Sequence, residues 1–234
     1  MKRLRKLITR SLPPLVALPL VVSAAWSGQA APRLTPAQPT LLEQPAVTEQ
    51  IDLEASLLQA APTLHPDALR AALRSRDALM AGGEITRPIL TVIDYSLPST
   101  VRRMWVFDLT SRRLLFHELV AHGRNSGEDL ARSFSNEEGS LMTSLGAFVT
   151  ESTYIGHNGI SLRLRGMEPG INDRAEARTI VIHGAPYVDA GIASKLGRLG
   201  RSHGCPALRP AIARTVINEI KDHTVLYAWY PSNG

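Results

Sequence analysis

The residues best placed to do chemistry are a lone cysteine and a histidine that precedes it. Cys205 is the only cysteine among the 234 residues, and His183 ends the β-branched run TIVIH, 22 residues earlier. A thiol becomes a strong nucleophile as the thiolate, and a neighbouring imidazole is the usual base that removes its proton. The spacing therefore indicates a Cys–His pair for acyl transfer. The structural alternatives are an inert buried cysteine and a histidine that is merely hydrogen-bonded at a strand end.

The residues next to Cys205 fit a nucleophile on a turn. Gly204 lets the backbone approach closely, and N–H groups around Cys205 are able to face a developing oxyanion. Ser202 is also an ordinary turn residue that needs no function. No metal site is expected, because zinc requires three or four ligands and one cysteine supplies too few thiolates.

The hydrophobic pattern predicts a β-rich domain that positions these residues. Helices are expected at residues 49–61, at 66–80 and after Pro210, where Ile212, Val216 and Ile220 recur every four residues. Alternating or β-branched segments predict strands at 89–95, 103–109, 112–120, 146–153, 160–165, 178–183 and 224–230. Helices, then many strands, then one helix and one strand give an α+β, mainly β fold rather than a parallel α/β fold.

The N-terminus is typical of an exported protein. Residues 1–30 begin with five basic and no acidic residues, continue with an apolar run at 12–25 and end with small Gly28 and Ala30, as a signal peptide does. Residues 31–48 are rich in Pro and Ala and predict a disordered linker. We therefore expect the protein in the periplasm or cell envelope. An uncleaved N-terminal anchor stays open, and weak membrane association is expected only in that case.

Charge and cysteine content exclude several classes of function. Of the 26 basic residues five lie in the expected signal peptide, so the remaining 21 balance the 21 acidic ones. With no basic stripe and few aromatic residues, nucleic acid is not expected as a partner. One cysteine in an exported chain forms no internal disulfide, which removes the usual role of extracellular cysteines.

The strings around both residues resemble a known family. Ser202-His203-Gly204-Cys205, after a strand that ends in His183-Gly184, resembles the signature of the L,D-transpeptidases (YkuD-type), bacterial enzymes that cross-link peptidoglycan. The resemblance covers residues 63–230 and is closest to the murein L,D-transpeptidase catalytic-domain-like subgroup. Its other strings are FSN at 134–136, SLG at 144–146, GISLRL at 159–164, IVIHGAPY at 180–187 and GRLGRSHGCPAL at 197–208.

The resemblance implies a fold and a mechanism. The fold would be a mostly antiparallel β-sandwich with a few short helices, as a catalytic domain over 85–234 with N-terminal helices (49–84) packed on it. Cys205 would attack a peptidoglycan stem tetrapeptide and release the terminal D-alanine, with His183 as base. Backbone N–H groups of Gly204 and Cys205 would hold the oxyanion, and Ser202 and His203 would support the site. No metal or other cofactor would be needed, and carbapenems would acylate the thiol.

The chain also departs from the family. Where the wider family usually has Arg or Asn two residues after the cysteine, this chain has Ala207, and the first arginine is Arg209. Weaker candidates for binding the stem are Arg178, Arg198, Arg201, Arg209 and Tyr187. The alternatives are a catalytically silent murein-binding module and an unrelated secreted cysteine peptidase. The sequence leaves open transfer versus hydrolysis, the acceptor, and whether the stem carries diaminopimelate or lysine.

Overall fold

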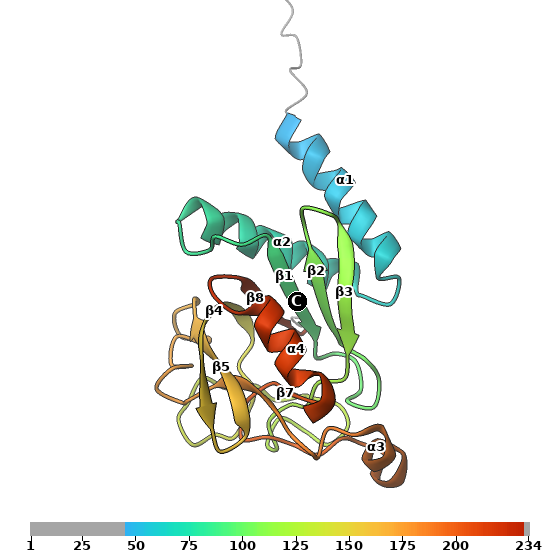
Figure 1. Ribbon diagram of the computed structural model, residues 1–234, viewed down its shortest axis with the longest axis vertical. Helices are drawn as coiled ribbons and strands as arrows, with labels where there is room; N and C mark the ends of the chain where they lie inside the picture. The colour runs from blue at the N-terminus through green and yellow to red at the C-terminus, as the bar shows by residue number, and fades with distance from the viewer. Residues whose placement is uncertain (1–44, 232–234) are drawn as a thin grey trace, which may run out of the picture. The chain divides into compact units, whose positions relative to one another are not determined.

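The computed structural model describes residues 45–231 (Figure 1). The expected signal peptide (1–30) and most of the expected linker (31–48) lie outside the described residues. The elements in chain order are α1 (Pro45–Ala60), α2 (Pro66–Ala81), β1 (Ile89–Asp94), β2 (Met104–Asp108), β3 (Arg113–Glu118), β4 (Gly146–Gly156), β5 (Gly159–Gly166), β6 (Val181–Gly184), α3 (Ala190–Leu196), β7 (Ala207–Leu208), α4 (Pro210–Ile220) and β8 (Val225–Trp229).

The eight described strands form one mixed sheet in the order β3-β2-β1-β8-β4-β5-β6-β7. Only the β1–β8 and β6–β7 pairs are parallel. Beyond β3 the chain pairs with β7 through an Ala121–Ala207 bridge, so the two edges of the sheet nearly meet. This confirms the α+β, mainly β prediction, with the strands of the expected sandwich joined in a single curled sheet.

The inner face of the sheet closes around α4. Figure 1 shows this helix between the β2–β3 hairpin and the β4–β5 pair. Val216, Ile217 and Ile220 of α4 are fully buried in one core cluster with side chains from β1, β2 and β4 to β8. The helix expected from the four-residue spacing of the apolar positions is therefore present as α4. Its apolar side is the side that is buried against the curled sheet.

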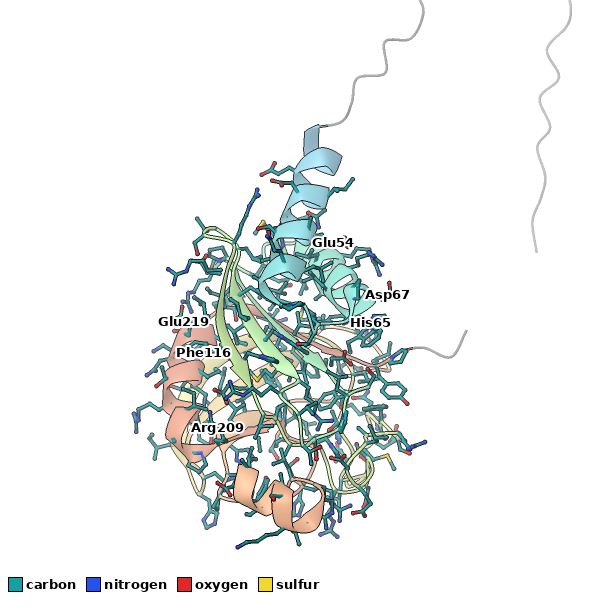
Figure 2. The ribbon with its side chains drawn as sticks, turned by 90° about the vertical axis from the view of Figure 1, so that its right-hand side faces the viewer. Glu54, His65, Asp67, Phe116, Arg209 and Glu219 are labelled. Atoms are coloured by element: carbon teal, nitrogen blue, oxygen red, sulfur yellow. The ribbon has the colours of Figure 1, made fainter. Side chains whose placement is uncertain are left out.

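The N-terminal helices cover the outer face of β1, β2 and β8. Leu57 of α1 and Leu69 of α2 are fully buried against Trp105 and the neighbouring strand residues. An ion pair between Glu54 and Arg70, 2.8 Å from Oε1 to Nε, joins the two helices. Figure 2 labels Glu54 near the start of α2. Among residues 45–231 no helix is long and apolar enough to cross a membrane.

Two elements near the signature were not predicted. Helix α3 is only seven residues long; Asp189 caps its first N–H groups and Gly197, at φ +65°, ends it. Strand β7 has two residues and exists through its pairing with β6. Elements this short carry too little periodic sequence to be predicted.

Candidate active site

His183 is held in one tautomer by its own strand. It lies in β6 opposite Ser161 of β5 and Ala207 of β7, and only 5% of it is exposed. Its Nδ1 lies 3.0 Å from the carbonyl oxygen of Gly184. A carbonyl only accepts hydrogen bonds, so Nδ1 carries the proton and the lone pair is on Nε2. The imidazole is thus arranged to accept a proton at Nε2.

A closed turn presents Cys205. The buried Ser202 hydroxyl donates to the Cys205 carbonyl at 2.6 Å and accepts from the Gly204 N–H at 3.1 Å. Gly204 has φ +124°, and a Cβ there would lie 2.8 Å from the Met142 carbonyl oxygen. Only glycine therefore fits this position without strain. Ser202 therefore fixes the turn, and the Gly204 N–H is occupied by its hydroxyl.

The thiol lies beside the start of β6. Ala207 and His183 are paired in parallel strands. Cys205 and Val181 each lie two residues before this pair, so Cys205 lies alongside Val181. Sγ donates to the Thr179 carbonyl at 3.8 Å. Burial raises the pKa of the Cys205 thiol, and hydrogen bonding to the Val181 N–H together with the Arg178 charge act in the opposite direction. Among residues 45–231 no hydrogen bond joins the thiol to His183.

Arg178 ties a long loop to this turn. Its guanidinium lies so close to Gly204 that an added Cβ would be 3.3 Å from Nη2. All of its hydrogen-bond acceptors belong to the loop at residues 135–144: the carbonyls of Ser135 (2.6 Å) and Met142 (2.6 Å) and the hydroxyls of Ser140 (3.1 Å) and Ser144. Arg178 was predicted from the sequence as a ligand for a stem carboxylate. In the structure its guanidinium holds this loop, and its role in substrate binding stays a prediction.

Two asparagines hold the same region from further away. Asn172 is fully buried and donates from Nδ2 to the carbonyls of Leu145 and Ala147, both at 2.9 Å. Asn136 donates to Asp173 at 2.6 Å and accepts from the Arg174 N–H at 3.1 Å. These partners are 25 to 38 residues apart in sequence, so no local pattern identifies them.

The remaining predicted residues have three different surroundings. Tyr187 lies near the thiol: burial, and then the Cys205 charge, raise the pKa of Tyr187 to about 12. His203 is exposed. The three arginines are engaged in ion pairs, Arg209 with both carboxylate oxygens of Glu118 (2.7 to 3.1 Å), and Arg198 (2.8 Å) and Arg201 (2.7 Å) with Glu128. Their role in substrate binding stays a prediction.

The described residues contain no group of three or more His, Cys, Asp or Glu side chains arranged to hold a metal ion. The chemistry that the arrangement itself offers is nucleophilic. It combines a thiol on a rigid turn, an imidazole with a free Nε2 on the adjacent strand, and a guanidinium that favours the thiolate.

Comparison with protein families identifies the domain that carries these residues. The model of the L,D-transpeptidase catalytic domain (YkuD_2) matches residues 60–229. The chain belongs to the L,D-transpeptidase catalytic-domain family. The match includes β1 to β8, and with them every residue of the site, and the family is one that acts on peptidoglycan. A comparison with curated protein sequences found no match.

Solved structures that are similar to this chain at low identity include two L,D-transpeptidases. The enzyme from Mycobacterium smegmatis is 15% identical, with 61% of this chain and 59% of that chain covered and a TM-score of 0.38. L,D-transpeptidase 3 from Mycobacterium tuberculosis is 16% identical (61% and 61%; TM-score 0.36). The helical cell shape determining protein Pgp2 from Campylobacter jejuni is 13% identical (68% and 56%; TM-score 0.42). The chain thus spans less than two thirds of the length of each of these proteins.

Proposed function

We propose that this L,D-transpeptidase family member is a cysteine acyltransferase that acts on peptidoglycan stem tetrapeptides. Cys205 is the nucleophile and His183 is the general base. The thiolate attacks the carbonyl carbon of the third stem residue and forms a thioester, while the C–N bond to the terminal D-alanine breaks. His183 takes the thiol proton at Nε2 and returns it to the leaving amine. An amine of a second stem, or water, then resolves the thioester.

The observation that carries the proposal is the hydrogen bond from His183 Nδ1 to the Gly184 carbonyl. It leaves Nε2 unprotonated on the strand beside the Cys205 turn, where a proton acceptor is needed. Because Sγ points at the Thr179 carbonyl, proton transfer requires the thiol to rotate toward the imidazole when substrate binds. The Cys205 N–H serves as an oxyanion donor, and the Gly204 N–H joins it when its hydrogen bond to Ser202 is released.

Intact mass spectrometry tests the nucleophile. The protein is incubated with a carbapenem and, separately, with a disaccharide-tetrapeptide. We expect a covalent carbapenem adduct that is absent from Cys205→Ala, together with loss of D-alanine from the tetrapeptide. A cross-linked dimer as product identifies transfer, and a tripeptide identifies hydrolysis. If the protein forms neither adduct nor product, the proposal is wrong and the silent murein-binding module is the alternative.

A matched pair of histidine variants tests the base. We expect His183→Gln to lower the rate of thioester formation by roughly a hundredfold or more, because general base catalysis is lost. His203→Gln changes an exposed side chain in the same signature and is expected to retain most of the activity. The reverse order would make His203 the base and contradict the assignment.

We also propose that the protein is exported and works in the periplasm or cell envelope. The basic start, the apolar run and the small residues before position 31 support export. Cell fractionation with N-terminal sequencing of the mature protein tests this, and full-length protein in the cytoplasm would contradict it.

A further inference from the structure

A groove between α2 and β8 is not used by the mechanism above. Its volume is about 560 Å³, and three of its lining residues are aromatic: Tyr227, Trp229 and Tyr230. Tyr227 and Trp229 are two apart on β8, so both side chains project to the face of the sheet that α2 covers. Cys205 packs in the core cluster on the other face and does not line this groove. The groove is therefore separate from the cysteine turn.

Two charged groups in the groove have no ionic partner within residues 45–231. Arg74 of α2 forms neither a hydrogen bond nor an ion pair there. Glu168 accepts one hydrogen bond, from the Ala147 N–H to Oε1 at 2.7 Å, which leaves Oε2 for a ligand. Burial, and then the Glu168 charge, raise the pKa of Tyr227, and the Arg74 charge acts in the opposite direction. A guanidinium, a carboxylate and a phenol hydroxyl thus face the same space.

The carboxylate of Glu168 is held in place by the backbone around it. Gly146 has φ +93°, and a Cβ there would lie 2.8 Å from this carboxylate. The Glu168 N–H donates to Oδ1 of the buried Asn172 at 2.8 Å. A group that is fixed before a ligand arrives loses little conformational entropy on binding.

The lining of the groove favours a neutral ligand. Its carboxylates are Asp67 and Glu168, and its guanidiniums are Arg70 and Arg74, so the charges balance. Arg70 pairs with Asp67, which removes these two from ligand binding. Aromatic rings beside a few fixed donors and acceptors suit a sugar, because its C–H faces are apolar and its edges carry hydroxyl groups.

A single loop joins the groove to the active site. Leu145 and Gly146 line the groove and directly follow Ser144, whose hydroxyl accepts a hydrogen bond from Arg178. Arg178 in turn lies beside Gly204 of the cysteine turn. The groove therefore begins where the loop at residues 135–144 ends.

We propose that this groove binds the glycan strand of peptidoglycan through an N-acetylated amino sugar. The sugar ring packs on Tyr227 and Trp229, and Glu168 accepts a hydrogen bond from a sugar hydroxyl. Arg74 donates to the carbonyl of the N-acetyl group. The inference rests on the proposed function and adds a second recognised part of the substrate, the sugar that carries the stem.

Kinetics with and without the sugar test the proposal. The two substrates are a disaccharide-tetrapeptide and the same tetrapeptide without sugar. We expect wild-type kcat/KM to be about tenfold higher for the disaccharide-tetrapeptide, because only this substrate makes the groove contacts. Arg74→Gln and Tyr227→Phe are expected to reduce that advantage and to leave the rate on the bare tetrapeptide unchanged. Arg113→Gln, an exposed arginine on β3 outside the groove, is the matched control with unchanged rates on both.

Binding of a sugar without a stem gives a readout apart from turnover. Chitotetraose, a β-1,4-linked tetramer of N-acetylglucosamine, is titrated by calorimetry into Cys205→Ala. We expect saturable binding that is weakened about tenfold by Arg74→Gln in that background and unchanged by Arg113→Gln.

The outcomes separate this inference from the proposed function. Equal wild-type rates on the two substrates without chitotetraose binding overturn the inference and leave the proposed function intact. Binding that Arg74→Gln and Tyr227→Phe both leave unchanged also overturns it, since the sugar then binds elsewhere. Retained chitotetraose binding in a protein that forms neither product nor carbapenem adduct supports the groove and overturns the proposed function alone.

Discussion

At the scale of single residues, the site depends on how a few polar groups are fixed around one sulfur. The Gly184 carbonyl sets the His183 tautomer, and Ser202 closes the turn that presents Cys205. Burial opposes ionisation of the thiol, so the groups that favour the thiolate matter more than they would at the surface. Arg178 is one of these groups, and it also holds the loop at residues 135–144.

Replacing Arg178 separates its two effects. The Arg178 charge lowers the pKa of the Cys205 thiol, so we expect Arg178→Gln to raise that pKa and to move iodoacetamide alkylation of Cys205 to higher pH. Loss of the loop contacts is expected to lower kcat by roughly ten- to a hundredfold. Arg178→Lys keeps the positive charge but lacks the several N–H donors of the guanidinium. This variant is expected to restore the alkylation profile but not kcat.

Arg113→Gln is the control, since Arg113 is an exposed arginine on β3 and has no contact with the loop at residues 135–144 among the described hydrogen bonds and ion pairs. Neither readout is expected to change in this variant. An alkylation profile of Arg178→Gln that matches the wild type would contradict the electrostatic role.

At the scale of elements, the segment from Ser202 to Ala207 is held between β6 and the segment that follows β3. One side is β6, which pairs with β7. On the other side, the chain beyond β3 bridges to Ala207 and Ser202. The pair formed by Glu118 and Arg209 fastens the end of β3 to the start of α4, where Arg209 is the N-cap residue. Figure 2 labels Arg209 at this end of α4.

Breaking this ion pair distinguishes a structural Arg209 from a substrate ligand. Glu118 is only 7% exposed, so we expect Glu118→Gln to lower the free energy of unfolding by about 1–3 kcal/mol. KM for the stem peptide is expected to stay unchanged at temperatures where the variant is folded. Urea denaturation and steady-state kinetics measure the two effects, with the exposed Glu138→Gln as control. A changed KM with unchanged stability would point to substrate binding.

At the scale of the whole molecule, the curled sheet buries charge-bearing groups as well as apolar ones. Arg103 is fully buried and donates to the carbonyls of Leu97 and Val120 and to His122 Nδ1 at 2.7 Å. His122 is fully buried too, and burial, with the Arg103 charge second, lowers the pKa of His122 to about 4. His122 is therefore neutral at pH 7 in the folded protein.

This burial makes stability depend on pH. The pKa of His122 in the folded protein is below its ordinary value of 6.5. As the pH falls, His122 is therefore protonated in the unfolded chain at a higher pH than in the folded protein, and this favours unfolding. We expect the free energy of unfolding to fall by about 3 kcal/mol between pH 6.5 and pH 4 through this residue. Urea denaturation across this pH range measures the effect. His122→Gln should show a flatter pH profile than the wild type, and His203→Gln should keep the wild-type slope. An unchanged slope in His122→Gln would refute the assignment.

The sequence by itself determined which segments form the long helices and strands, and which two residues are the candidate nucleophile and base. Apolar periodicity and the residue types around Cys205 and His183 are local signals, and local signals are readable from the chain. It also indicated the family, because several strings occur in the right order.

The tertiary structure alone decided the surroundings of the thiol. Arg178 was visible as a charge near the motif, but its acceptors lie 34 to 43 residues away. Asn172 likewise holds the carbonyls of Leu145 and Ala147, which lie 27 and 25 residues away. Such contacts depend on how distant segments pack, and no property of the separate segments specifies that packing.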